Sequence, residues 1–181
     1  MAKTQIEDVN RNIYDIKNKD DYDFKMEKGL NREIVEEISK QKNDPDWMRE
    51  IRLKALEAYE KLELPTWGPD LSELNMEEIA TYVRPKTKLN HNWEDVPEEI
   101  KDTFDKLGIP EAEKKSLAGV GAQYDSEVVY HSMKEDLKKK GVIYTDMETA
   151  VREYPEIVKK HFMKCVPITD HNFVALHAAV W

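Results

Sequence analysis

The stretch DPDWMREIRLKALEAYEKLELPTWGPDL, residues 44–71, combines a helix that has a clear start with a stiff aromatic turn. Asp44 is a residue type that accepts hydrogen bonds from the free amides of a first helical turn, and Pro45 suits the first helical position because it has no amide hydrogen. We therefore expect a helix from Pro45, capped by Asp44. Its apolar residues recur at spacings of three and four, which predicts one buried stripe: Met48, Ile51, Ala55, Ala58 and Leu62.

Two large apolar residues in this stretch do not belong to the stripe. Leu53 points among the charged residues of the helix, so either another segment covers it or it belongs to an interface. Trp67 lies in PTWGPDL, residues 65–71, where two prolines and a glycine end the helix and give a turn of limited flexibility. Both residues are candidates for contacts with another protein.

The rest of the chain predicts an α+β fold, mostly helical with a few short strands. Asn31 can cap a helix that runs to about Lys42, and further helices are expected after Pro97, over 134–140, after a capping box at Thr145 and Glu148, and from Pro155. SEVVYHS (126–132) and GVIYTD (141–146) are rich in β-branched and aromatic residues and predict strands. Residues 72–96 are expected to be mostly loop, with one or two helical turns around Met76–Val83.

The two ends of the chain differ in character. Residues 1–29 form a charged segment that we expect to be a flexible arm, ordering only against a partner, and residues 30–181 are expected to form the folded domain. The last stretch begins with Asp170 as a predicted cap and is apolar from Phe173 to Trp181, apart from His177. We expect this run to pack on a core beyond Trp181, in a chain cut within a domain.

Composition limits the possible partners. A formal net charge of −9 argues against general binding to nucleic acid or anionic membranes, since both need a basic surface. The absence of a long apolar run argues against a membrane span and against a secretory signal peptide. Cys165 is the only cysteine, which excludes an internal disulfide and zinc sites that need two or four cysteines. A reducing, cytoplasmic setting is expected.

Few residues could carry chemistry. His161 and Cys165 are four residues apart on a predicted helix and could share one metal ion, with His171 and His177 nearby in sequence. A packed histidine beside a small cysteine explains the same pattern. A cysteine–histidine nucleophile pair would need an orienting third group, and no residue can be proposed for it. We predict no catalytic, cofactor-binding or metal-binding residue in this chain, and no enzyme activity of its own.

The run from Asp44 to Leu71, together with AGVGAQYDSEVVYHSMKEDLKKKGVIYTDMETAVREYPEIVKKHFMKCVPITDHNFVALHAAVW (118–181), resembles the N-terminal region of the SufB/SufD family of iron–sulfur cluster assembly proteins. The resemblance covers about residue 5 to Trp181. It implies a scaffold subunit whose right-handed parallel β-helix begins after AAVW. It also implies an iron–sulfur cluster whose ligands lie beyond Trp181. Some relatives carry three close cysteines where this chain has RPKTKLNHNWEDVP (84–97), so a cluster site of that type is excluded here.

The resemblance also implies partners: the ATPase SufC, SufD or a second SufB, and a cysteine desulfurase or sulfur-transfer protein. An alternative is a helical interaction module without cluster chemistry, which recruits a sulfur donor through the charged arm, Leu53 and Trp67. Two further hypotheses are a metal site on His161 and Cys165, and an unrelated helical protein. The sequence leaves open the choice between SufD and a second SufB, the cluster type, and a role for flavin.

Overall fold

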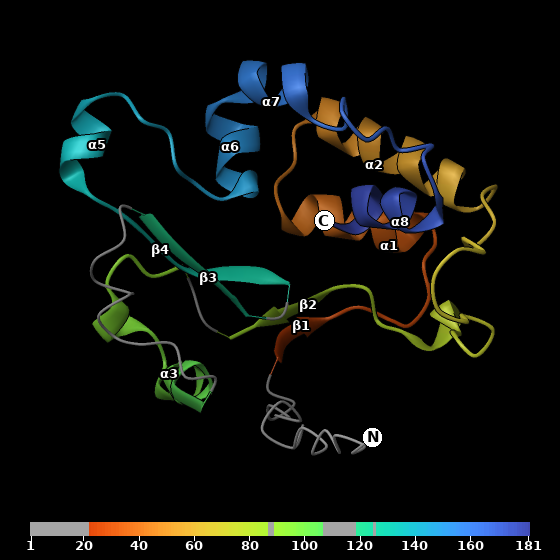
Figure 1. Cartoon of the computed structure of the whole chain (residues 1–181), viewed down its shortest axis with the longest axis horizontal. Coiled ribbons are helices and arrows are strands. Elements are labelled where there is room, and N and C mark those ends of the chain that lie inside the picture. Colours follow the sequence, from red (N-terminus) through yellow and green to blue (C-terminus); the bar gives the residue numbers. More distant parts are fainter. Residues whose placement is uncertain (1–21, 87–88, 107–118, 125) are drawn as a thin grey trace, which may run out of the picture. The chain divides into compact units, whose positions relative to one another are not determined.

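The computed structural model of the protein describes residues 22–86, 89–106, 119–124 and 126–181, so most of the predicted arm lies outside the described residues. The predicted α+β class is confirmed, because helices are accompanied by two small two-stranded sheets (Figure 1). The chain divides into two compact units. Of the described residues, one unit contains 89–106, 119–124 and 128–142, and the other contains 22–86, 126–127 and 143–181.

The larger unit is built from five helices of the described chain and a short sheet. The helices are α1 (Arg32–Gln41), α2 (Asp46–Tyr59), α6 (Met147–Glu153), α7 (Pro155–His161) and α8 (Asn172–Val180). Strand β1 (Tyr22–Lys25) pairs antiparallel with β2 (Val83–Pro85), and a 3-10 turn, η2, covers Met76–Glu78. Strand β1 thus falls within the segment 1–29 that we expected to be an arm. In the segment 72–96, η2 agrees with the helical turn expected around Met76–Val83, whereas β2 was not predicted.

Helix α1 begins where the sequence predicts. Asn31 is extended, and its side-chain oxygen accepts a hydrogen bond from the Ile34 amide at 2.9 Å. Ile34, Val35 and Ile38 are buried on one side of the helix. The local cap and the apolar spacing therefore suffice to define this element.

The predicted cap of α2 is wrong. Pro45 occupies the N-cap position and no side chain caps this helix end. Asp44 instead accepts a hydrogen bond from Nε of Arg52 at 2.5 Å, and both side chains are buried. A buried guanidinium is a stronger partner for a carboxylate than a free amide, which explains why the tertiary contact prevails over the local one.

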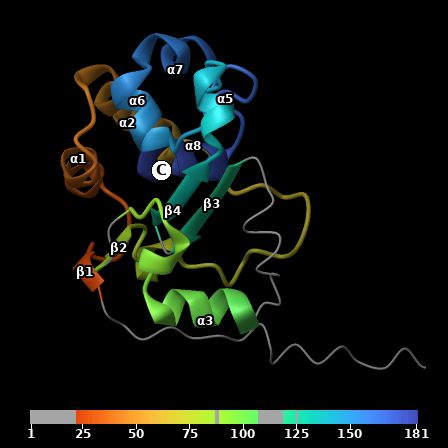
Figure 2. The ribbon, with the colours of Figure 1, turned by 90° about the vertical axis from the view of Figure 1, so that its left-hand side faces the viewer.

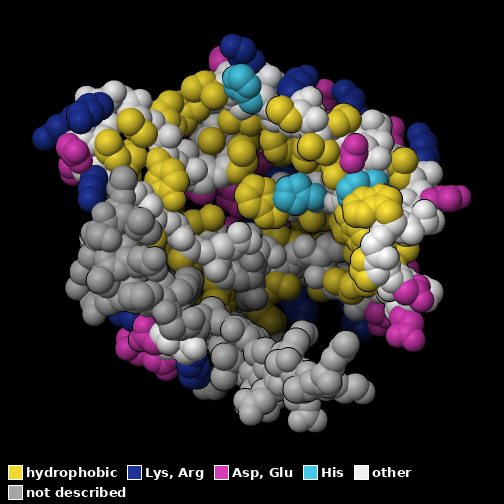
Figure 3. All heavy atoms as spheres, viewed as in Figure 1, with side chains coloured by type: hydrophobic (Ala, Val, Ile, Leu, Met, Phe, Trp, Pro, Cys, Tyr) yellow, Lys and Arg dark blue, Asp and Glu magenta, His cyan; other side chains and the backbone are white. Residues whose placement is uncertain are grey.

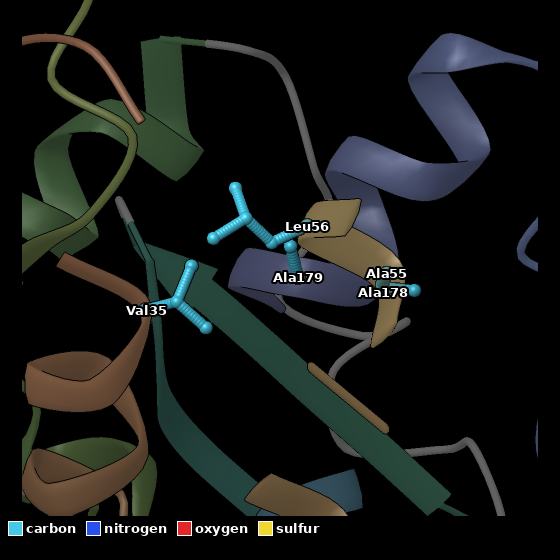
Figure 4. Close-up of a cluster of buried hydrophobic side chains, with 5 residues drawn as sticks. All are labelled: Val35, Ala55, Leu56, Ala178 and Ala179. Atoms are coloured by element: carbon cyan, nitrogen blue, oxygen red, sulfur yellow. The ribbon is translucent and has the colours of Figure 1, made fainter. Parts of the chain in front are cut away.

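The C-terminal apolar run packs inside the larger unit, which corrects our expectation that it would pack on a core beyond Trp181. Ala175, Ala178 and Ala179 of α8 are buried, and α8 lies against α2 and touches α1. Small side chains let the helices approach closely. Figure 4 shows the cluster that joins the three helices: Val35, Ala55, Leu56, Ala178 and Ala179. The predicted cap is also wrong, since His171 and not Asp170 precedes this helix.

Near its start, the same face of α2 is covered by α6 and α7. Met48 is buried with Val151 and Val158, and Trp47 packs at the edge of this second cluster. Leu53, which did not fit a single stripe, is partly buried against the first cluster. Helix α2 thus has different neighbours along its length, and another part of the chain covers much of the Leu53 side chain.

Within the described residues of the smaller unit, α3 (Glu98–Lys106) follows a 3-10 turn, η3 (Trp93–Asp95). Strands β3 (Gly119–Tyr124) and β4 (Glu127–Met133) form the second sheet, and α5 (Glu135–Lys139) follows; both views show the strands side by side (Figures 1 and 2). The predicted helices after Pro97 and over 134–140, and the strand SEVVYHS, are confirmed. Buried residues from these elements form its core: Val96, Ile100, Ala122, Val129 and Tyr130.

The predicted strand GVIYTD is wrong. Gly141 has a positive φ of 80°, and residues 142–146 form neither a helix nor a strand. Val142, Ile143 and Tyr144 are exposed. No described strand pairs with this segment, and side chains that favour strands do not make one without a hydrogen-bonding neighbour.

Candidate interaction surface

The four residues considered for metal binding do not form one site. Helix α7 ends at His161, so Cys165 lies beyond the helix and is exposed; the predicted i, i+4 pair on one helix is wrong. His171 and His177 contact aromatic rings instead, as described below. Within the described residues, no group of three or more histidine, cysteine or acidic side chains could hold a metal ion.

A buried lysine gathers polar groups from several elements of the larger unit. The Lys42 side chain, at the end of α1, is 5% exposed. Its ammonium contacts Glu148 of α6, lies 3.6 Å from Oε1 of Glu127, and sits 5.1 Å from the centre of the Tyr82 ring. The Tyr82 hydroxyl donates to Oε1 of Glu127 at 2.5 Å. Lys42, Glu127, Glu148 and Tyr82 are called the Lys42 network below.

Burial changes the acidity of this network. Loss of solvent raises the pKa of Glu148, and the charges of Glu127 and Asp146 raise it further, against the opposing effect of Lys42. Burial and the hydrogen bond to Glu127 raise the pKa of Tyr82 above its ordinary value. Glu148, predicted as half of a capping box with Thr145, is therefore used for a tertiary contact.

The cap of α6 lies one residue beyond the predicted one. Asp146 accepts hydrogen bonds from the Thr149 amide and hydroxyl, both at 2.8 Å. Burial alone would raise the pKa of Asp146, but these hydrogen bonds lower it overall. Helix α6 itself is confirmed, with its start fixed by Asp146.

A second buried network ties α2 to the end of α8. Arg52 is 2% exposed and, besides pairing with Asp44, donates from Nη1 to the carbonyl oxygens of Ala179, at 3.4 Å, and Trp181. Asn172, at the other end of α8, donates to the carbonyl oxygens of Tyr59 and Leu62 at 3.1 and 3.0 Å. Arg52 and Asn172 thus supply donors to carbonyls that helix ends leave without partners. These hydrogen bonds hold the elements together, which fits a structural role.

The surface of the larger unit offers two features that could meet another molecule. The first is an open groove of about 640 Å³ along α1 and α2. It is lined by side chains of both charge signs, with Leu53 as the apolar one: Arg32, Glu36, Ser39, Lys40, Asn43, Asp44, Arg49, Glu50 and Leu53.

The second feature is aromatic. Trp67 is 69% exposed, and its ring meets the His171 ring edge-on at 5.6 Å, while His171 meets Phe173 in the same way at 6.2 Å. His177 stacks on Trp181 at 5.4 Å. Figure 3 shows apolar side chains with histidines among them over the region that α8 occupies in Figure 1. Sequence reasoning singled out Trp67 but did not place it against α8.

Neither feature has the composition of a catalytic centre, so the comparison with known proteins carries most of the functional information. A family model described as the SufBD protein N-terminal region matches residues 30–180. The chain belongs to this family. The resemblance inferred from residues 44–71 and 118–181 is confirmed, and with it the assignment to iron–sulfur cluster assembly proteins.

Curated relatives agree with the family match. The chain is 51% identical over 181 residues to the iron–sulfur cluster assembly protein SufB of Bacillus subtilis. This alignment covers 100% of this chain and 39% of the relative. The chain is 51% identical, with the same coverage, to a SufBD family protein of Staphylococcus haemolyticus. A SufBD family protein of Staphylococcus aureus is 54% identical over 158 residues, 87% of this chain and 34% of the relative. The chain thus spans about two fifths of the length of these relatives.

Two further properties follow from the described residues. None of their helices is long and apolar enough to cross a membrane. Among them, strands occur only as the two short pairs, with no β-helix.

Proposed function

We propose that this chain is the N-terminal part of an iron–sulfur cluster assembly scaffold. The match to the SufBD N-terminal region over residues 30–180 is the observation that carries this proposal. In this proposal, the whole protein works in the cytoplasm with the ATPase SufC and with SufD or a second SufB. A cysteine desulfurase or sulfur-transfer protein supplies the sulfur. The nascent cluster is the cargo of the assembly, and the residues that bind it lie outside residues 1–181.

In this proposal the chain has no enzymatic step of its own, and ATP hydrolysis belongs to SufC. Its contribution is a folded body and surfaces for partner proteins. We propose residues 30–181 as the domain shared with the family, preceded by a charged arm, residues 1–29. The start of the family match at residue 30 supports this boundary.

A chimera tests the proposed function. Residues 1–181 of this chain replace the aligned segment of Bacillus subtilis SufB, in a strain whose own SufB can be depleted. We expect the chimera to restore growth and the activity of iron–sulfur enzymes, since 51% identity preserves most contacts. A SufB that lacks the aligned segment is the control and should not restore them. A chimera that accumulates at normal levels and still fails would contradict the proposal.

A further inference from the structure

Residues 60–73, called the Trp67 loop below, present a large aromatic side chain to solvent on a constrained backbone. Trp67 is 69% exposed, the largest exposed fraction among the exposed large apolar residues of the described chain, and Leu64 beside it is 36% exposed. Pro69 is also exposed. Tryptophan is among the side chains enriched at the energetic centres of protein interfaces.

The Trp67 loop is held in shape by its own residues. Pro65 and Pro69 restrict φ on both sides of the tryptophan, and Gly68 has a φ of 97°, which side chains rarely adopt. The Asp70 carboxylate accepts a hydrogen bond from the Ser72 amide at 2.9 Å. The edge-on contact with His171 orients the Trp67 ring. Such a loop loses little conformational entropy when it binds.

The charge around Trp67 has one dominant sign. The Trp67 loop carries four carboxylates and a single cation, Lys61. The four carboxylates are exposed, and none forms an ion pair with a described residue: Glu60, Glu63, Asp70 and Glu73. An apolar centre with an acidic margin is complementary to an apolar pocket with a basic margin.

We infer that the Trp67 loop is a docking element for a protein partner. The partner presents an apolar pocket, wide enough for an indole ring, with lysine or arginine side chains around it. Trp67 and Leu64 enter the pocket, and the four carboxylates face its basic margin. The acidic margin excludes nucleic acid as the partner, because phosphate would be repelled.

This inference rests on the proposed function only for the choice of partners to test. It goes beyond that function because it assigns a surface and a partner chemistry to particular residues. Docking through Trp67 requires no cluster chemistry from this chain, so the two proposals can fail separately.

The experiment uses three purified SUF proteins from Bacillus subtilis as probes: SufC, SufD and the cysteine desulfurase. Each is titrated against the SufB chimera that contains residues 1–181 of this chain. Binding is measured by biolayer interferometry. A second copy of the chimera is titrated in the same way. We expect the binding of one of the three probes to depend on the Trp67 loop, so that Trp67→Ala weakens it about 30-fold, as for a central tryptophan, and leaves the binding of the other two unchanged. Trp67→Phe keeps an aromatic ring and should recover part of the affinity. A joint change of the four carboxylates to their amides should slow association about tenfold.

Ile157→Ala is the matched control, because Ile157 is 52% exposed on α7, outside the Trp67 loop. It should bind like the unchanged chimera, and thermal melting should show that all variants are folded. Three results would overturn the inference: Trp67→Ala binds all three probes as tightly as the unchanged chimera, it weakens the binding of all three equally, or it weakens only the binding of a second copy of the chimera. If the unchanged chimera restores growth while any of these holds, the docking inference fails and the proposed function stands.

Discussion

Arg52 connects three parts of the larger unit through one side chain. Its guanidinium pairs with Asp44 and donates to carbonyl oxygens at the end of α8, where it is almost fully buried. A buried charge that loses its partner is costly, because neither water nor protein then solvates it. The stability of the fold therefore depends on Arg52 and Asp44 being present together.

We expect Arg52→Ala to lower the free energy of unfolding by about 3 to 5 kcal/mol, since Asp44 would remain buried without a partner. Urea unfolding followed by circular dichroism measures this. In a double-mutant cycle with Asp44→Ala, the second change should cost much less than the first. Additive losses from the two changes would show that Asp44 and Arg52 do not act as a pair, and a loss near 1 kcal/mol for Asp44→Ala alone would fit the cap that the sequence predicted.

The Lys42 network makes a prediction about pH. Because burial raises the pKa of Glu148, the folded state holds this proton more tightly than the unfolded state. The stability that Glu148 contributes is then present below its unfolded pKa and falls as pH rises through the folded pKa. Glu148→Gln removes this titration and can still accept a hydrogen bond from Lys42.

We therefore expect Glu148→Gln to be at least as stable as the unchanged chain at neutral pH, with the difference shrinking below the ordinary pKa of a glutamate. Thermal melting between pH 4 and pH 8 would test this. Glu156→Gln, at an exposed pair on α7, is the control and should show no such trend. A variant that is clearly less stable at neutral pH would show that the attraction to Lys42 outweighs the cost of burial.

At the scale of elements, local signals defined helix interiors better than helix ends. Asn31 caps α1 as predicted, because no distant group competes for its side chain. Asp44 and Glu148 were assigned to helix starts by the same reasoning, but each is bound by a buried cation: Asp44 by Arg52, further along the same helix, and Glu148 by the distant Lys42. In the sequence, Asp44 and Glu148 lie among other polar and charged residues, as on the solvent-exposed face of a helix. Only the tertiary fold shows which charges are buried, so neither polar network could be predicted.

The junction between α2 and α8 gives a prediction about one element contact. Asn172 supplies both of its amide hydrogens to carbonyl oxygens at and just beyond the end of α2. Asn172→Ala leaves the Tyr59 and Leu62 carbonyls without this donor and should cost about 1 to 3 kcal/mol. Chemical denaturation measures the loss, with the exposed Ser72→Ala as a control expected within about 0.5 kcal/mol of the unchanged chain. An equal, small effect of both changes would mean that water replaces the Asn172 amide.

At the scale of the molecule, the larger unit is assembled from stretches that are far apart in sequence. Its first cluster joins α1 and α2 to α8, which begins more than 100 residues later. Such contacts have no local signature, so the resemblance identified the family while the pairing of α8 with α2 was missed. The apolar run 173–181 correctly predicted burial, but only the structure shows that it packs on α1 and α2.

The packing of α8 against α1 and α2 makes the larger unit dependent on its last helix. Removing residues 172–181 would uncover Val35, Ala55 and Leu56 and leave the Arg52 guanidinium without its carbonyl acceptors. We expect the truncated chain to lose the cooperative unfolding transition of this unit, and its α1 and α2 amides to exchange with solvent at least about 100-fold faster, which corresponds to about 3 kcal/mol. Hydrogen exchange with mass spectrometry reports the two helices directly. His177→Gln changes an exposed position of the same helix and should leave their protection intact. Unchanged protection in the truncated chain would mean that α1 and α2 form a stable hairpin alone, and that α8 adds to the core without holding it.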